Sequence, residues 1–244
     1  MEARTSIIEK RLSSINRIIA VASGKGGVGK SLVASTLALN LVKNGKKVGL
    51  LDLDLYGPSS HIILDIHDVF PKEDYGIIPP TMHGINFMSV VYFTEDKPAP
   101  FRGIDITNII IELLAITQWG ELDYLIIDLP PGIGEETLDI IRFIKKAEFL
   151  VISTPSKVAL AAVDKLIKIL QEMKLPTIGI IENMVHQPSS LIKKSMKQYN
   201  IRYLGQLLYD STIENNLGFP NKLVKTNFAK ELDNLMNSFL YQSP

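Results

Sequence analysis

The chain contains the stretch Gly24-Lys25-Gly26-Gly27-Val28-Gly29-Lys30-Ser31, and this stretch decides its fold. It satisfies the pattern G-x-x-x-x-G-K-[ST], which is typical of loops that bind nucleotide phosphates. Glycines let the backbone turn tightly around the phosphates, Lys30 offsets their charge, and Ser31 offers a hydroxyl to Mg²⁺. An apolar, strand-like run precedes the stretch and a helical pattern follows it. The sequence therefore predicts a nucleotide site with the binding residues Gly24, Lys25, Gly26, Gly27, Val28, Gly29, Lys30, Ser31 and Leu32.

Short apolar runs alternate along the chain with segments of helical periodicity. The runs are continuously apolar, which is typical of parallel strands that helices cover on both faces. They lie at residues 18–22, 48–51, 124–127, 149–152 and 178–181. The helical segments lie at residues 32–42, 107–117, 135–145, 158–173 and 228–240. This order predicts an α/β fold with a doubly wound, mostly parallel sheet, helices on both faces, and ligands at the carboxyl ends of the strands.

The composition fits one large folded domain of this class. With 244 residues, we expect a short N-terminal extension over residues 1–15 and a single domain over residues 16–244. The 26 basic and 26 acidic side chains balance, so charge gives no reason to expect nucleic acid as the main partner. No apolar run approaches the roughly 20 residues that cross a membrane, and the polar N-terminus is no signal peptide. We expect a cytoplasmic protein with no membrane partner.

Two segments rich in Pro and Gly, residues 70–83 and 92–103, are expected to form surface loops. The chain contains no cysteine, which excludes disulfides, thiolate nucleophiles and cysteine-ligated metals.

Carboxylates follow two of the predicted strands. Asp52 and Asp54 lie one residue apart after the second apolar run, and Asp128 ends the run at residues 124–127. Carboxylates at such strand ends hold Mg²⁺-bound water and orient an attacking water in phosphoryl transfer. Taken alone, Asp52 and Asp54 are more typical of a helix cap and a turn than of a functional pair. Their place one strand–helix unit after the phosphate loop favours the functional interpretation.

These motifs resemble the Mrp/ApbC-like branch of the MinD/ParA deviant Walker A P-loop ATPases, the iron–sulfur cluster carrier family. The resemblance covers about residues 16–240 and implies a P-loop NTPase fold and a Mg-ATP-dependent homodimeric ATPase. It rests on the Lys-Gly-Gly-x-Gly-Lys-Ser order at residues 25–31, on Asp52-Leu53-Asp54-Leu55-Tyr56-Gly57-Pro58-Ser59, on Asp128-Leu129-Pro130-Pro131-Gly132, and on Arg102-Gly103 and Trp119-Gly120-Glu121-Leu122-Asp123.

The resemblance implies three catalytic side chains. Lys25 would reach across a nucleotide-sandwich homodimer to the partner's phosphates, as an arginine finger does. Lys30 would neutralise phosphate charge in its own subunit, and Asp54 would position the hydrolytic water. The alternative is that Lys25 is a solvated lysine of the loop with no such role.

The resemblance also implies the metal and base contacts. Ser31 and Asp128 would hold Mg²⁺, with Asp52 close to its ligand shell. Asn183, after the run at residues 178–181, would hydrogen-bond the adenine, because an amide both donates and accepts. No Asn-Lys-x-Asp guanine motif occurs, since Leu223 and Val224 follow Asn221-Lys222. ATP is therefore favoured over GTP.

The chain departs from the family at three places. Ile133-Gly134-Glu135 stands where the family usually has Thr-Gly-Asp, and Leu208 stands where it usually has Pro. The Cys-x-x-Cys that would bridge an iron–sulfur cluster across the dimer is missing, and residues 185–191 contain His186 instead. One histidine per subunit gives two ligands, short of the four that such clusters need, so His186 is better explained as a loop residue. His61, His67 and His83 show no ligand spacing.

Two biological roles follow. One is iron–sulfur cluster assembly, with cluster ligands supplied by an assembly or acceptor protein. The other is a nucleotide-switched positioning or partitioning ATPase of the MinD/ParA type without a cluster.

The amphipathic segment at residues 228–240 carries no excess positive charge for a membrane surface, so we expect it to pack onto the domain. A small basic patch, Lys193, Lys194, Lys197 and Arg202, is typical of a solvated helix face.

Overall fold

An eight-stranded sheet forms the centre of the molecule in a computed structural model that describes residues 2–55, 57–94, 103–188 and 190–240. Its strand order is β10-β9-β8-β1-β7-β2-β6-β5, and all neighbouring strands are parallel except β5, which runs antiparallel to β6. The strands are β1 (Ile15–Ser23), β2 (Val48–Asp52), β5 (Thr81–Met82), β6 (Ile85–Ser89), β7 (Leu122–Asp128), β8 (Glu148–Ser153), β9 (Thr177–Val185) and β10 (Tyr203–Leu208). The predicted doubly wound, mostly parallel sheet is confirmed.

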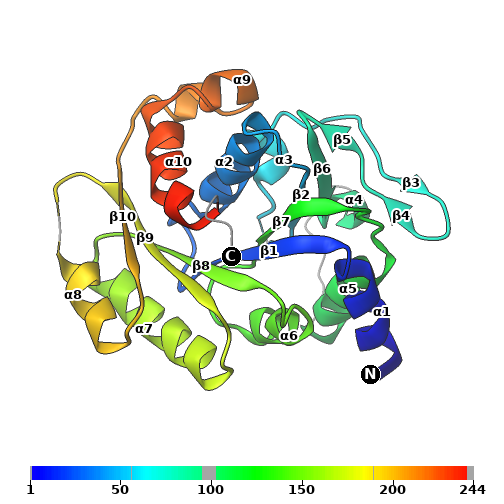
Figure 1. The fold of residues 1–244 in the computed structure, drawn as a ribbon, viewed down its shortest axis with the longest axis horizontal. Coiled ribbons are helices and arrows are strands. Elements are labelled where there is room, and N and C mark those ends of the chain that lie inside the picture. The colour runs from blue at the N-terminus through cyan, green and yellow to red at the C-terminus, as the bar shows by residue number, and fades with distance from the viewer. Residues whose placement is uncertain (1, 56, 95–102, 189, 241–244) are drawn as a thin grey trace.

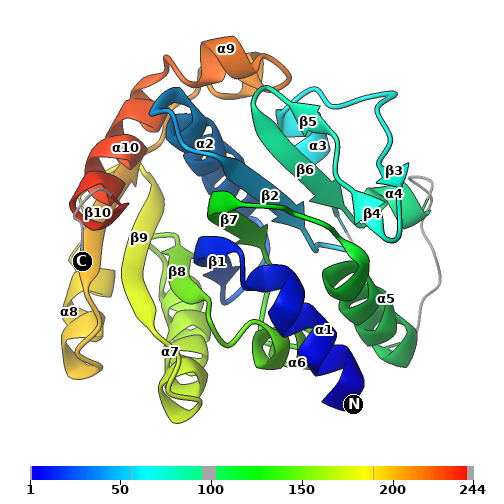
Figure 2. The same cartoon turned by 45° about the vertical axis from the view of Figure 1, so that its right-hand side comes forward.

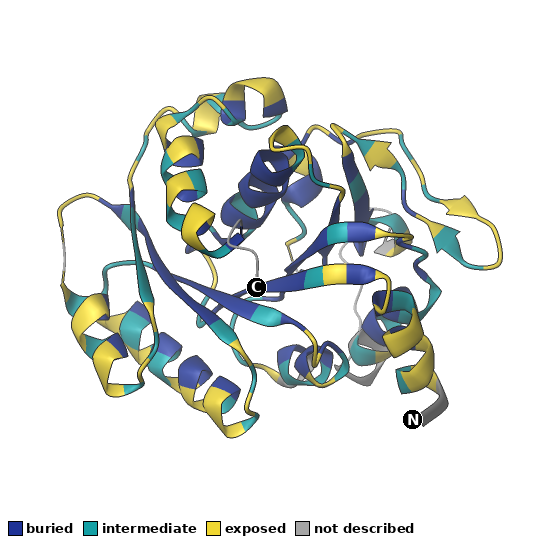
Figure 3. Ribbon diagram, in the orientation of Figure 1, coloured by how far each residue is buried: buried dark blue, intermediate teal, exposed yellow. Residues whose placement is uncertain are grey.

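Helices cover both faces of this sheet (Figures 1 and 2). One face packs against α1 (Glu2–Leu12), α5 (Gly103–Ile116), α6 (Glu135–Phe143), α7 (Lys157–Glu172) and α8 (Leu191–Gln198). The other packs against α2 (Lys30–Lys43), α3 (Ser60–Ile63), α9 (Pro220–Leu223) and α10 (Asn227–Leu240). Successive β1 residues point to opposite cores, with Ile18 in the first and Ile19 in the second. The strand is therefore continuously apolar from Ile18 to Ala22, and Figure 3 shows its centre buried.

The remaining elements are short and lie mainly around β6. They are β3 (Lys72–Glu73), β4 (Ile77–Ile78), α4 (Val91–Thr94) and the 3₁₀ turn η1 (Glu214–Asn216). The loop expected at residues 70–83 contains the β3–β4 hairpin and β5. The loop expected at residues 92–103 begins instead within α4, because β6 ends at Ser89 and the Phe93 amide then donates to the carbonyl of Val90 at 3.0 Å, which starts a helical turn. Residues 95–102 of that loop lie outside the described residues.

The first and last helices both pack onto the domain. Ile8 and Leu12 of α1 are buried in the core shared with α5, and Ile15 already belongs to β1. The expected boundary at residue 16 stays a prediction. In α10, the apolar side Phe228, Ala229, Leu232, Met236 and Leu240 is buried. Its packing onto the domain is confirmed. Within the described residues, no helix combines the length and apolar character needed to cross a membrane.

Candidate nucleotide-binding site

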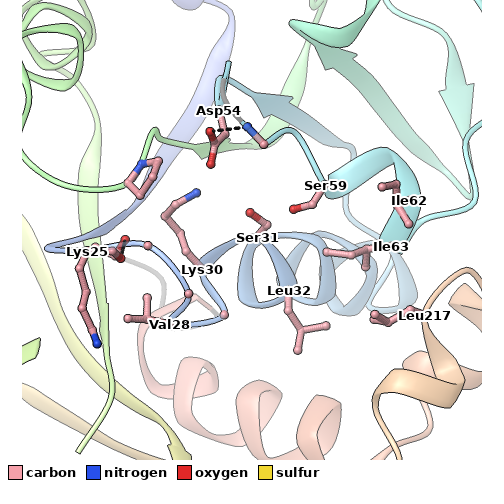
Figure 4. A pocket seen from close by; sticks show the side chains of 16 residues that line it. Lys25, Val28, Lys30, Ser31, Leu32, Asp54, Ser59, Ile62, Ile63 and Leu217 are labelled. Carbon is pink, nitrogen blue, oxygen red and sulfur yellow. Dashed lines mark hydrogen bonds between the residues drawn. The ribbon is translucent and has the colours of Figure 1, made fainter. Parts of the chain in front are cut away.

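The glycine-rich loop joins the end of β1 to the start of α2, and close packing explains its glycines (Figure 4). Gly29, directly before α2, has φ of 81°, and a Cβ there would lie 2.4 Å from Nδ2 of Asn183. A Cβ at Gly24 would lie 2.6 Å from the carbonyl carbon of Ala162 in α7. Neither position accommodates a side chain without displacement. The loop is therefore held between β9 and α7, with its backbone at the carboxyl edge of the sheet.

A cavity of about 360 Å³, which we call the loop cavity, opens above this loop. Its lining contains most of the predicted binding residues and the carboxylate Asp54, together with residues of α3 such as Ile62. The predicted residues that line it are Lys25, Gly26, Gly27, Val28, Gly29, Lys30, Ser31, Leu32 and Asp54. Gly24, Asp52 and Asp128 are not in the lining, because Gly24 packs on α7 and the two carboxylates are buried beneath it.

Lys30 and Asp128 form a buried ion pair beneath the loop cavity. The Lys30 Nζ bonds Oδ1 of Asp128, and the Ser31 side chain also hydrogen-bonds Asp128. The Oδ2 atom of Asp128 is buried and has no hydrogen-bond partner in the described part of the chain. Burial raises the pKa of Asp128, while Lys30 and Ser31 act against that rise. Asp128 thus keeps one oxygen for a further donor or a cation.

Asp52 lies beside Asp128 because β2 and β7 are parallel neighbours that pair these two residues in register. Its Oδ1 accepts the amide of Asp54 and its Oδ2 accepts the amide of Ser60, both at 3.1 Å. Burial, together with repulsion from Asp128, raises the pKa of Asp52 to about 7. Both Asp52 oxygens are thus used to shape the turn between β2 and α3, which places this residue near the metal position but not free to bind directly.

Asp54 and Lys25 differ in where they point. Asp54 lines the loop cavity and accepts the amide of Gly57 at 3.1 Å. Figure 4 shows the Lys30 amine directed toward Asp54, whereas the Lys25 side chain extends away from both. Lys25 is partly exposed and belongs to the lining of the loop cavity. Tyr56 and Arg102 lie outside the described residues, as does the side chain of Glu135.

A second cavity of about 230 Å³, which we call the adjoining cavity, continues from the first. The two share Gly29, Leu32, Ile63 and Leu217 in their linings. Asn183 is buried at its wall, and its Nδ2 donates to the carbonyl of Val28 at 2.9 Å.

Of this second lining, sequence reasoning named Gly29, Leu32 and Asn183 as binding residues and noted Leu208 as a departure from the family. It assigned no binding role to Met184 or to the segment after β10, which contributes Tyr209, Asp210, Ser211, Ile213 and Glu214. The signal that points to this segment is its position directly after a strand end, but β10 was not predicted.

Three observations test whether this site fits Mg²⁺. Asp128 Oδ2 is an orphaned buried oxygen, and the Ser31 side chain hydrogen-bonds the same carboxylate. Across the described ranges, no group of three or more acidic or histidine side chains is arranged to hold a metal ion unaided. Mg²⁺ binds with few protein ligands and completes its shell from phosphates and water. Ser31 and Asp128 therefore fit Mg²⁺ that arrives with a nucleotide.

The loop after β9 shows what stands where cysteines were expected from the family. The His186 ring stacks on the Tyr209 ring, with the centroids 4.4 Å apart and the planes 28° from parallel. Both side chains are exposed, and Tyr209 lines the adjoining cavity. The sequence supplies no thiolate to a cluster here or elsewhere.

Comparisons with known proteins agree with this geometry. A family model described as ParA, NUBPL iron-transfer P-loop NTPase, matches residues 14–241. An iron–sulfur cluster carrier protein of Methanococcus maripaludis is 34% identical over 259 residues, covering 98% of this chain and 90% of that protein. Proteins of the same description from Pseudomonas fragi and Aquifex aeolicus are 38% and 40% identical, covering 71% and 72% of this chain but 62% and 50% of their own lengths. The chain thus spans half to two thirds of the length of several relatives.

Two solved structures have a fold similar to that of this chain. A nucleotide-binding protein of Archaeoglobus fulgidus in complex with ADP aligns with a TM-score of 0.78 and 32% identity, covering 93% of this chain and 96% of that one. The MinD protein of Pyrococcus horikoshii with Mg-ADP aligns with a TM-score of 0.69 at 19% identity, covering 91% and 95%, which shows a shared fold. With the family model matching nearly its whole length, this chain belongs to the NUBPL-type iron-transfer P-loop NTPases, the family of the iron–sulfur cluster carrier proteins.

Proposed function

We propose that this chain binds Mg-ATP and hydrolyses it to ADP and phosphate as a homodimer, in the service of iron–sulfur cluster assembly. The observation that carries the proposal is the Lys30–Asp128–Ser31 cluster, in which Lys30 and Ser31 line the loop cavity and Asp128 is buried behind them. The loop cavity suits the phosphates and the adjoining cavity suits the base, and the two share a wall. The Archaeoglobus fulgidus relative with ADP supports the same ligand class.

The hydrolysis step needs a positioned water and compensation of charge. In the proposal, Asp54 accepts a hydrogen bond from the water that attacks the terminal phosphorus, the bond to the bridging oxygen breaks, and ADP leaves. The proton that the water loses passes to the released phosphate. Lys30 offsets charge on the phosphates once it leaves Asp128; Ser31 and Asp128 would hold Mg²⁺, which would supply charge neutralisation at the phosphate oxygens. Asp54 already lies in the loop cavity, with a backbone amide fixing one of its oxygens.

The homodimer is supported by the direction of Lys25. This side chain turns away from its own Lys30 and Asp54, so it is free to reach phosphates held by a second copy. Lys25→Ala should leave ATP affinity within about threefold but lower phosphate release about tenfold or more. It should also remove the rise of specific activity with protein concentration. Unchanged turnover in Lys25→Ala would exclude the role across the dimer, and Lys157→Ala, an exposed lysine at the start of α7, serves as the matched control.

The cluster is cargo in this proposal, with its thiolates supplied by another protein. Relatives described as iron–sulfur cluster carriers support the role, and the absence of cysteine from this chain requires the outside ligands. The same absence supports the second candidate, a nucleotide-switched positioning ATPase without a cluster. The cytoplasmic location stays a prediction.

Anaerobic reconstitution with iron and sulfide separates the two roles. The purified chain is incubated with and without ATP, alone and together with a cysteine-containing scaffold protein, and bound iron and absorbance are measured. ATP-dependent capture of iron with the scaffold supports the cluster role. ATP-dependent dimerisation without iron in either arm favours the nucleotide switch.

A further inference from the structure

The register between the parallel strands β9 and β10 shifts twice beside the adjoining cavity. Tyr203 pairs with Ile180 and Gly205 with Ile181, so β10 contains one extra residue there. Gln206 then pairs with Glu182, and Leu208 pairs with Val185, so β9 contains one extra residue in turn. Two compensating bulges thus bracket the Gln206–Glu182 pair. Bulges of this kind are common beside functional sites, where they redirect side chains.

The second bulge is the part of β9 that enters the site. It contains Asn183 and Met184, which both line the adjoining cavity. Met184 has φ of 57°, a conformation uncommon for a residue other than glycine. The first bulge includes Gly205, whose φ of 154° is a conformation that residues with a side chain rarely adopt. The irregular register is therefore built into both strands.

Glu182 lies at the centre of this arrangement. It is fully buried, and its Oε2 accepts the hydroxyl of Tyr203 at 2.9 Å and the amide of Gln206 at 2.8 Å. In a regular strand, residues 203 and 206 would face opposite sides of the sheet. The bulge at Gly205 brings both to one carboxylate, so these two bonds exist only in the irregular register.

The nucleotide chemistry described above does not use Glu182. Its Oε1 is buried and finds no donor among the residues the structure describes. An apolar side chain would fill the position without an unpaired oxygen, so a buried carboxylate here is retained at a cost in stability. Burial and the bond to Glu182 raise the pKa of Tyr203, so its hydroxyl remains a donor at neutral pH.

We propose that Glu182 is a positioning residue for the nucleotide base, which holds β10 in the irregular register and so fixes both walls of the adjoining cavity. One wall is Asn183 and Met184, the residues next to Glu182. The other begins at Leu208 and Tyr209, two and three residues after Gln206, and the amide of Tyr209 bonds the carbonyl of Val185 at 3.0 Å. This inference rests on the proposed function, because it assigns the adjoining cavity to the base.

The test compares a ligand that has a base with one that lacks it. Affinities of the full chain for ATP and for inorganic tripolyphosphate, both with Mg²⁺, are measured by calorimetry. Glu182→Leu removes the acceptor. It should weaken the binding of ATP about tenfold, equivalent to about 1.4 kcal/mol, and leave the affinity for tripolyphosphate within twofold of the wild type. Glu182→Gln keeps a carbonyl acceptor and should stay within about threefold for both ligands. Equal weakening of the two ligands, or no weakening, in Glu182→Leu overturns the inference.

Two further measurements keep the inference testable if Glu182→Leu does not fold. Tyr203→Phe deletes a single oxygen and should weaken ATP about threefold without affecting tripolyphosphate. The same variant should accelerate hydrogen exchange at the Tyr209 amide, before any ligand is added. Unchanged exchange and unchanged ATP affinity would overturn the inference. Wild-type protein that binds tripolyphosphate but not ATP excludes the base assignment, and binding of neither ligand overturns the proposed function itself.

Discussion

The loop cavity and the adjoining cavity belong to one site, yet they are built in different ways. The loop cavity is lined mainly by a continuous stretch, residues 25–32, that lies between β1 and α2. The adjoining cavity is lined by short pieces from α2, α3, β9 and the segment after β10. A continuous stretch can be recognised from its residue order, whereas a wall assembled from distant segments depends on strand register. The difference predicts strong, local effects of substitution on the phosphate side and weaker, distributed effects on the base side.

The largest effect is expected at Lys30. Lys30→Ala removes the side chain that offsets phosphate charge and leaves Asp128 and Asp52 buried without their cation. ATP affinity should fall at least a hundredfold, equivalent to about 2.7 kcal/mol, and calorimetry measures it directly. Lys43→Ala, at the other end of the same helix, should bind ATP as the wild type does. If Lys30→Ala bound ATP normally, the loop cavity would not be the phosphate site.

Hydrolysis without loss of binding should depend on Asp54. Asp54→Ala removes the carboxylate that lines the loop cavity, and phosphate release should fall about a hundredfold because the water is no longer oriented. ATP affinity should stay within about threefold, since Asp54 carries like charge to the phosphates. Single-turnover phosphate release and calorimetry on the same preparation separate the two quantities. Full turnover in this variant would remove Asp54 from the catalytic set.

The sequence predicted that the residues of the loop cavity and the carboxylates beside it come together, and the reason is physical. Continuous apolar runs mark buried parallel strands, and the carboxyl ends of such strands meet at one edge of the sheet. Asp52 and Asp128, 76 positions apart in the chain, are accordingly paired in register. The order of motifs was therefore enough to bring Lys30, Ser31 and both carboxylates together.

The base side could not be predicted in the same way. β6 and β10 were missed because polar residues interrupt their apolar runs, Asn86 in one and Gln206 in the other. The two bulges that shape the adjoining cavity exist only once β9 and β10 are paired. The direction of Lys25 and the double use of the Asp52 oxygens likewise depend on tertiary contacts.

The buried carboxylates predict a pH dependence of stability. Because the pKa of Asp52 is about 7 in the folded protein and about 4 when unfolded, the folded protein binds this proton more tightly. The contribution of protonated Asp52 to the free energy of unfolding is therefore fully present below about pH 4 and is lost as the pH rises through about 7. The melting temperature of nucleotide-free protein in EDTA should fall by roughly 3–6 °C more between pH 5 and pH 8 than that of Asp52→Asn.

The two proteins are compared by the slope of the melting temperature against pH, not by the melting temperature itself. Asn at position 52 turns an amide group toward one of the two backbone amides that Asp52 accepts, so its absolute stability differs for another reason. Equal slopes for the two proteins would show that Asp52 is ionised in the folded state at pH 5.

The smallest effect is expected at Asn183, where the two cavities meet. Its Nδ2 holds the carbonyl of Val28, so the residue supports the phosphate loop and lines the adjoining cavity at once. Asn183→Ala should weaken the binding of ATP about fivefold and that of tripolyphosphate about twofold, because one neutral hydrogen bond is lost in the adjoining cavity and one to the phosphate loop. Asn183→Asp keeps the volume but removes the donor and adds charge, and it should weaken both ligands more than alanine does. A loss confined to ATP would show that the Val28 bond does not shape the phosphate loop, and the two halves of the site would then be energetically separate.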